Sequence, residues 1–139
     1  MIRFRKQLEI DADPKEVFSI ISDPGRITEF WKGTRQVIRQ GDFYRIRFAF
    51  PAWGLMSFHP DAERMTVLTS YLKGPVKGSK IDAVLIRSGR TVLQTEWNVK
   101  LSFYLRPFER RIGTHFETGA DHAIRRIKES LEKRKEIVL

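Results

Sequence analysis

The sequence predicts an α+β fold, a helix-grip arrangement in which a curved antiparallel sheet of about six to seven strands wraps around one long C-terminal helix. Two observations predict it. Apolar and polar residues alternate with period two, between closely spaced turn residues, over most of the chain up to about residue 104. Beyond it, apolar residues recur at spacings of three and four, the period of a helix. The 139 residues suit one domain, residues 1–139.

The N-terminal part is expected to form one strand followed by two short helices. Residues 2–10 alternate apolar with mostly charged side chains, which is typical of a half-buried strand. Asp13 can act as an N-cap with Pro14 at the first helical position, so a helix is expected to begin there. The sequence Asp23-Pro24-Gly25 should end it, and a second short helical segment is expected over residues 26–31.

Turn residues divide the next part of the chain into strands. The expected ranges are 34–39, 43–50, 55–59, 64–72, 80–87 and 91–104. Their short separations predict a meander of hairpins. In the last strand, alternate apolar residues from Leu93 to Phe103, among them Trp97, predict one buried face, whereas Glu96 belongs to the solvated face.

A long amphipathic helix is expected from Pro107 to about Ile137. At about 1.5 Å per residue it would be roughly 45 Å long, and only a whole sheet is long enough to pack along it. A sheet that curls around such a helix is expected to leave a cavity between them. The helix's apolar positions are Phe108, Ile112, Phe116, Ala120, Ala123, Ile127 and Leu131.

Composition excludes several classes of function. The chain has no cysteine, which removes disulfides, thiolate nucleophiles and cysteine zinc sites. Its +9 formal charge is spread along the chain rather than gathered in one block, which favours a solvated surface. The abundant Lys, Arg and Glu, with a single asparagine, resemble a thermophile composition. With no transmembrane-length apolar run and no leader pattern at Met1–Asp11, a soluble cytoplasmic protein is expected.

Local sequence adds a family resemblance that covers essentially the whole chain. It is carried by Ile10 to Phe18, by Ile21-Ser22-Asp23-Pro24, by the pair Phe30-Trp31, and by the long strand and amphipathic helix. These features resemble the START/Bet v 1-like superfamily, also called SRPBCC or helix-grip, the polyketide cyclase/dehydrase and lipid transport group. The resemblance implies the fold but not one function. Members of the superfamily include carriers of sterols, lipids and quinones, cyclases and dehydratases, and co-chaperone-like binding modules.

The candidate ligand site lies between the inner strand faces and the small residues of the terminal helix. Gly119, Ala120 and Ala123 would leave volume opposite Trp97 and Val99. The alternatives are that these small residues only permit close helix–sheet contact and that aromatic side chains fill the core. The expected cavity lining is Phe30, Phe48, Phe50, Tyr71, Thr95, Trp97, Val99, Phe116, Gly119, Ala120 and Ala123.

Metal and catalytic signals are weak. His115 and His122 are seven residues apart, about 10.5 Å along a helix, whereas a shared metal favours a spacing of four. No metal site and no cofactor are therefore expected. Glu29, Asp82 and Glu96 form no recognisable catalytic pair, and the chain has no phosphate-loop, dinucleotide or serine-hydrolase motif, so no catalytic residue is assigned.

Three functions follow from these observations. The leading one is non-enzymatic binding or transport of a hydrophobic small molecule such as a lipid, a quinone or a polyketide-like aromatic. The second is a cyclase or dehydratase acting on a ligand in the same cavity. The third is a protein or nucleic-acid interaction module, with nucleic acid not favoured, that uses a basic outer face made of Arg3, Arg5, Arg45 and Arg47. The basic end of the helix also suggests weak association with an anionic membrane surface.

Overall fold

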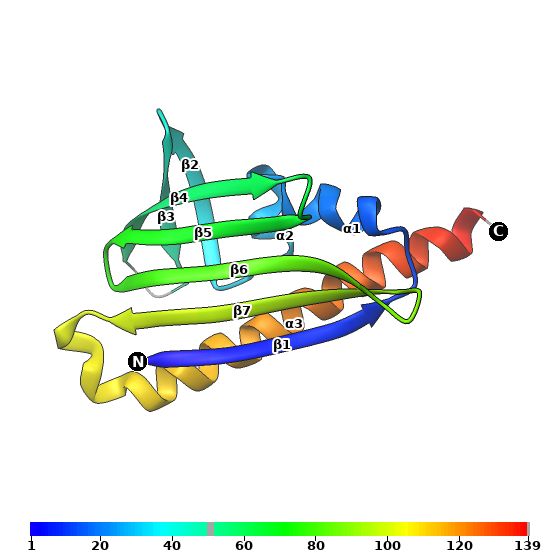
Figure 1. Ribbon diagram of the computed structural model, residues 1–139. Helices are drawn as coiled ribbons and strands as arrows, with labels where there is room; N and C mark the ends of the chain where they lie inside the picture. The colour runs from blue at the N-terminus through cyan, green and yellow to red at the C-terminus, as the bar shows by residue number, and fades with distance from the viewer. Residues whose placement is uncertain (50–51, 139) are drawn as a thin grey trace.

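One seven-stranded antiparallel sheet packs against one long helix in the computed structural model, which describes residues 1–49 and 52–138 (Figure 1). The helical segments are α1 (Pro14–Ile21), η1 (Pro24–Arg26), α2 (Ile27–Phe30), η2 (Phe103–Phe108) and α3 (Glu109–Val138). The strands are β1 (Ile2–Ile10), β2 (Thr34–Gln40), β3 (Phe43–Phe48), β4 (Trp53–Asp61), β5 (Thr66–Lys73), β6 (Val76–Arg87) and β7 (Arg90–Leu101).

The sheet is a meander closed at one end by the first strand. Its order is β1-β7-β6-β5-β4-β3-β2, so consecutive hairpins run from β2 to β7 and β1 pairs with β7. The α+β helix-grip architecture that the sequence predicts is confirmed. In Figure 1, α3 runs along the β1–β7 side of the sheet, and α1 and α2 lie beside its C-terminal half.

The helix start signal at Asp13 acts as the sequence predicts, and Asp23, which was expected to end the first helix, also caps the next one. The Asp13 carboxylate accepts a hydrogen bond from the Lys15 N–H at 2.8 Å, and Pro14 occupies the first turn of α1. The Asp23 carboxylate accepts from the Gly25 N–H at 2.9 Å, which begins η1 directly after α1 ends. Each side chain satisfies a backbone donor that a helix start otherwise leaves without a partner.

The end of β7 differs from the sequence prediction. The strand was expected to continue to residue 104 with Phe103 on its buried face, but it stops at Leu101. Its partner β6 begins at Val76, which pairs with Leu101, so no neighbouring strand is left to continue the ladder. Ser102 instead donates its N–H to Pro75 O and its hydroxyl to Gly74 O, and Phe103 lies 78% exposed in η2.

Other strand boundaries differ as well, and β5, expected from Arg64, begins at Thr66. Strand β4 was expected over residues 55–59 but runs from Trp53 to Asp61, because Pro60 keeps its register opposite Val67 although it cannot donate to the ladder. Strand β6 was expected from Lys80 but begins four residues earlier. Gly78 makes this possible, because its φ is +128° and a Cβ there would lie 2.4 Å from Asn98 O.

The core lies between the concave face of the sheet and the buried face of α3. Leu93 and Val99 of β7 are buried opposite Ala123 and Ile127 of α3 in one continuous cluster. The first helix closes the cluster with Val17 and its neighbours. At the other end of α3, a Cβ at Gly113 would lie 3.4 Å from Ile2 Cγ1, so Gly113 marks a close approach of α3 to β1.

The arginines proposed for a basic outer face do not form one patch. Arg3 and Arg5 lie on β1, whereas Arg45 and Arg47 lie on β3. These strands are five strand spacings apart in the sheet order, about 24 Å at roughly 4.8 Å per spacing. Arg5 is also paired with Glu96 at 3.2 Å.

Among the described residues, no helix combines the length and apolar content needed to cross a bilayer.

Candidate ligand-binding pocket

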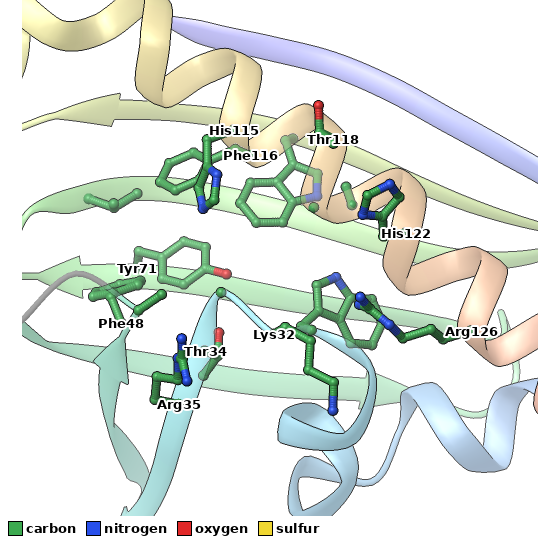
Figure 2. A pocket seen from close by; sticks show the side chains of 17 residues that line it. Lys32, Thr34, Arg35, Phe48, Tyr71, His115, Phe116, Thr118, His122 and Arg126 are labelled. Atoms are coloured by element: carbon green, nitrogen blue, oxygen red, sulfur yellow. The ribbon is translucent and has the colours of Figure 1, made fainter.

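A pocket with a volume of about 340 Å³ opens between the concave face of the sheet and the middle of α3 (Figure 2). The connection from α2 into β2 and the end of β3 form its third side. The lining comes from three places in the sequence: Phe48, Ala49, Tyr71, Val76 and Trp97 of the sheet side, Trp31, Lys32, Gly33, Thr34 and Arg35 of the α2–β2 connection, and His115, Phe116, Thr118, Gly119, Ala120, His122 and Arg126 of α3.

Aromatic rings form the inner wall of the pocket. The Trp97 ring is stacked on Phe4 at 5.4 Å between centroids and packs against Tyr71 at 6.2 Å and Phe116 at 5.7 Å. Its Nε1–H donates to the Thr95 hydroxyl at 3.0 Å, which fixes the ring plane. Because each ring is braced by another, the wall is preformed and apolar.

The small residues of α3 leave the space that the pocket occupies. A Cβ built at Gly119 would meet no atom within 4 Å, and Gly119 and Ala120 both line the pocket. Ala123 is one turn further along, fully buried in the core beyond the pocket. Each interpretation of the small residues therefore holds at a different position. Gly119 leaves open space beside the pocket, whereas Ala123 permits close packing in the core.

Six of the residues proposed from the sequence line this pocket. They are Phe48, Tyr71, Trp97, Phe116, Gly119 and Ala120.

Four others are buried in the core and do not border the pocket. Phe30 lies beneath the Arg26 guanidinium, with the Arg26 Cζ 5.3 Å from its ring centroid, and Thr95 holds the Trp97 ring. Val99 and Ala123 belong to the sheet–helix interior. Phe50 lies outside the described residues.

The polar residues of the rim are those that the sequence reasoning missed as a group. His115, Thr118, His122 and Arg126 follow spacings of three, four and four, so they share one flank of α3 beside Phe116. That spacing is visible in the sequence and could have identified them. Lys32 and Arg35, which lie on the opposite side of the pocket from α3 in Figure 2, carry no such signal because only the tertiary fold brings them there.

The charge of the rim is one-sided. Lys32, Arg35 and Arg126 line the pocket, and its described lining includes no aspartate or glutamate. Arg126 is held in place by a hydrogen bond from its Nη1 to Phe30 O at 2.8 Å. Among the described residues, no group of three or more His, Asp or Glu side chains is arranged to hold a metal ion.

A buried ion pair lies behind the aromatic wall. Lys80 Nζ is 3.2 Å from Asp82 Oδ2, and both side chains are less than a tenth exposed. The same ammonium lies 4.0 Å from the Trp31 ring centroid and 5.3 Å from that of Trp97. The outward-facing Ile81 between them is 43% exposed. The strand thus places charge inside and an apolar side chain outside, contrary to the usual pattern.

Three buried polar atoms at or beside this pair have no hydrogen-bond partner among the described residues. They are Asp82 Oδ1, Thr69 Oγ1, whose residue pairs with Lys80 across the β5–β6 ladder, and Trp31 Nε1, which belongs to a pocket-lining residue. Burial, with a smaller contribution from the negative charge of Asp82, raises the pKa of Tyr71 well above its usual range. Tyr71 is therefore a neutral phenol, and Figure 2 shows its hydroxyl directed into the pocket.

Comparison with known proteins identifies the fold. No protein-family model matches the sequence, and no curated protein is detectably similar to it. Among solved structures, a START superfamily protein from Mycobacterium smegmatis is similar over 96% of this chain and 99% of its own, with 15% identity and a TM-score of 0.73. The Zhui aromatase/cyclase from Streptomyces sp. R1128 has 14% identity and a TM-score of 0.71 over 95% and 94% of the two chains.

A third similar structure is a norcoclaurine synthase point mutant from Thalictrum flavum, with 17% identity and a TM-score of 0.69 over 96% of this chain and 95% of its own. These likenesses span nearly the whole length of each chain. The chain therefore has the helix-grip fold of the START/Bet v 1-like superfamily.

Proposed function

We propose that this protein binds a hydrophobic small molecule, such as a lipid, a quinone or a polyketide-like aromatic, in the pocket between the sheet and α3. One observation carries the proposal: the open space beside Gly119 is enclosed by braced aromatic rings rather than filled by them. Its volume of about 340 Å³ falls within the roughly 300–1,000 Å³ range of small-molecule sites. Burial of apolar ligand surface would drive binding at about 25 cal/mol per Å².

A substitution at Gly119 tests this directly, because the space beside it is open. Gly119→Phe would put a ring into the pocket without meeting a neighbour at its Cβ. It is expected to abolish displacement of a pocket-bound hydrophobic dye and to remove any hydrophobe that native mass spectrometry finds in the purified protein. Gly119→Ala is the matched control, since it adds only one methyl group and should leave the dye affinity within about twofold.

Gly113→Ala is a second control on the same helix, where a Cβ meets Ile2 rather than the pocket. Unchanged dye binding in folded Gly119→Phe would contradict the proposed site. Equal losses in Gly119→Phe and Gly113→Ala would trace the effect to α3 stability rather than to the pocket.

A cyclase or dehydratase-type activity is the second candidate, favoured by the neutral Tyr71 hydroxyl inside the pocket. A neutral phenol can donate a hydrogen bond to the carbonyl oxygen of a bound ketone and so stabilise the enolate that forms when a base, such as the imidazole of His115 or His122 in the pocket lining, takes the adjacent proton. Deuterium exchange at the carbon beside the carbonyl of 2-tetralone, followed by NMR in D2O, would test it. Exchange that depends on Tyr71 and is lost in Tyr71→Phe would support an enzyme; binding without exchange would support a carrier.

A further inference from the structure

We propose that the ligand is an amphiphile with an apolar body and one anionic group, a carboxylate or a phosphate, at the pocket rim. This inference rests on the proposed function, because it specifies the molecule that the pocket takes. Its basis is the one-sided charge of the lining, which comprises Lys32, Arg35 and Arg126 with the imidazoles of His115 and His122. An anion held among these groups would be the counter-charge that the described lining lacks.

The carboxylates nearest in sequence to the rim are committed elsewhere. Glu117 of α3 is 3.1 Å from Lys6 Nζ, and Asp121 is 2.9 Å from Arg125 Nε. On the other side, both carboxylate oxygens of Glu29 accept hydrogen bonds from Arg26.

Arg26 accordingly lowers the pKa of Glu29, with a weaker contribution from Lys32. Glu29 thus attracts Lys32 at longer range, but no described carboxylate forms an ion pair with Lys32, Arg35 or Arg126. Arg126 is anchored by the protein, because Phe30 O accepts a hydrogen bond from one of its nitrogens while other guanidinium N–H groups remain to donate to a ligand.

A second observation points to the same ligand chemistry. Trp31 lines the pocket, is 8% exposed, and its Nε1–H has no acceptor among the described residues. Unpaired buried donors are uncommon in folded proteins because the lost hydrogen bond to water is not replaced. This nitrogen has no exposed surface in the described structure, so the oxygen acceptor of a ligand at the rim would reach it only after the ring moves.

Binding of alkyl probes below their micellar concentrations tests the inference by calorimetry and tryptophan fluorescence. Dodecanoate and dodecyl phosphate are expected to bind at least about tenfold more tightly than dodecan-1-ol, the factor that one hydrogen bond to a charged group supplies. The preference should shrink at about 1 M salt. Acetate and inorganic phosphate alone should bind much more weakly than either amphiphile, because they lack the apolar body; the two amphiphiles compared with each other distinguish a carboxylate from a phosphate ligand.

Paired variants separate the rim from the overall charge. Lys32→Gln with Arg35→Gln is expected to reduce the preference for dodecanoate to about threefold or less. The control, Arg39→Gln with Arg64→Gln, removes the same two charges from exposed positions outside the pocket lining and should keep it.

The outcomes are distinguishable. Equal binding of all three alkyl probes would overturn the anionic group while leaving the hydrophobic pocket intact. An equal loss of preference in the control variant would assign the preference to the net charge of +9. That result would also overturn the proposed anionic group at the rim. Failure of every alkyl probe and of a hydrophobic dye to bind would overturn the proposed function itself.

A different surface carries a second inference: the structure assigns the η2 segment to docking on an anionic membrane surface. Phe103, Tyr104 and Phe108 are 78%, 56% and 53% exposed within one six-residue segment. Such a group of exposed aromatic side chains is unusual on a solvated surface. Its flanking cations are Arg106, Arg110 and Arg111.

Charge makes a bilayer the complementary partner. The nearest carboxylate of this segment, Glu109, is bound by the N-terminal ammonium of Met1 at 2.6 Å, and no described carboxylate pairs with the three arginines. Proteins that bind membrane surfaces often insert aromatic rings into the headgroup region and place arginines against anionic lipids.

Vesicle co-sedimentation tests this assignment. The protein is expected to bind vesicles of phosphatidylcholine with phosphatidylglycerol but not phosphatidylcholine alone, and Phe103→Ser with Phe108→Ser should weaken binding about tenfold or more. Ile86→Ser is the control, since Ile86 is 66% exposed at the opposite end of the β6–β7 hairpin. Absence of vesicle binding or equal loss in the control would overturn the assignment. The assignment would also be overturned if the protein did not bind vesicles but formed a dimer that the double variant dissociates.

Discussion

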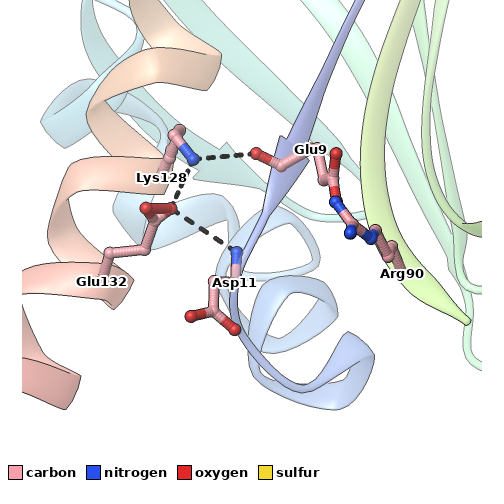
Figure 3. Close-up of polar contacts among 5 residues, drawn as sticks. All are labelled: Glu9, Asp11, Arg90, Lys128 and Glu132. Atoms are coloured by element: carbon pink, nitrogen blue, oxygen red, sulfur yellow. Dashed lines mark hydrogen bonds and ion pairs between the residues drawn. The ribbon is translucent and has the colours of Figure 1, made fainter.

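Two polar regions lie less than two turns apart on α3 and differ in how their charges are matched. At the pocket rim, Arg126 and the two cations facing it have no carboxylate in the described lining. Around Lys128, Figure 3 shows a network in which the ammonium of Lys128 meets the carboxylate of Glu132. Lys128 Nζ is 2.6 Å from Glu132 Oε2 and donates to Glu9 O at 3.0 Å.

The same network joins the helix to the end of β1. Glu132 accepts from the Asp11 N–H at 3.5 Å, and Glu9 pairs with Arg90 at 2.8 Å. Its bonds connect α3, β1 and β7, so they hold the fold together. Among the rim cations, Arg126 bonds to Phe30 O, and all three border the pocket. The matched charges join elements of the fold, whereas the unmatched charges border the cavity in which we propose that a ligand binds.

The largest effect is expected where a matched charge is also buried. Asp82→Ala would leave the Lys80 ammonium uncompensated behind the aromatic wall and should lower the free energy of unfolding by about 3–5 kcal/mol in urea titrations. Lys80→Met with Asp82→Leu removes both charges and should recover most of the loss. If Asp82→Ala cost less than about 1 kcal/mol, the pair would not be the structural element that its burial indicates.

The next effect concerns pH and Tyr71. Because burial raises the pKa of Tyr71 in the folded state, the unfolded chain loses this proton first as the pH rises, and stability falls above the unfolded value of about 10. The expected loss is about 1 kcal/mol between pH 10 and 11, because the unfolded tyrosine is only half deprotonated at pH 10. Tyr71→Phe should remove this component from urea titrations, whereas Tyr104→Phe, at an exposed position, should not. Identical slopes in the wild type and Tyr71→Phe would contradict the assigned shift.

A smaller effect is expected from the Lys128 network. Glu132→Gln weakens contacts to Lys128 and to the Asp11 N–H, both partly exposed, and should cost about 0.5–1 kcal/mol of unfolding free energy. Glu129→Gln, an exposed glutamate of the same helix with no ion pair in the described structure, provides the matched control. A cost equal to that of the control would show that the network contributes nothing.

The smallest effect is expected at the rim and completes the contrast. Lys32→Gln with Arg35→Gln should change the free energy of unfolding by no more than about 0.5 kcal/mol in the absence of ligand. The same variant is the one expected to lose selectivity for anionic amphiphiles. A stability loss as large as that of Glu132→Gln would instead make the rim cations structural and remove the contrast.

Much of the fold could be predicted because its signals are local. The alternation in β1, the cap at Asp13 and the spacing along α3 each reflect a few neighbouring residues. The site was predicted only in part for the same reason. Phe116 and Gly119 lie on a face that helical spacing defines, whereas Lys32 and Arg35 reach the pocket only through the path of the chain after α2.

The segment Lys80-Ile81-Asp82 shows the limit of sequence patterns most clearly. Alternation establishes that Lys80 and Asp82 share one face, but hydrophobicity alone would turn Ile81 inward. The register is set by β6 as a whole, in which Val76 and Val84 have the same parity as the two charged residues and are buried. Pairing with β5 and β7 then carries the ion pair inside as well.

The sequence by itself determined the element order, the two periodicities and the small residues of the helix. The tertiary structure decided which of those small residues face open volume, because this depends on the distance from the sheet: Gly113 meets Ile2, and Gly119 meets nothing. It also decided the charge of the rim, because Arg126 is distant in sequence from Lys32 and Arg35 and lines the same pocket only when α3 lies across the curved sheet.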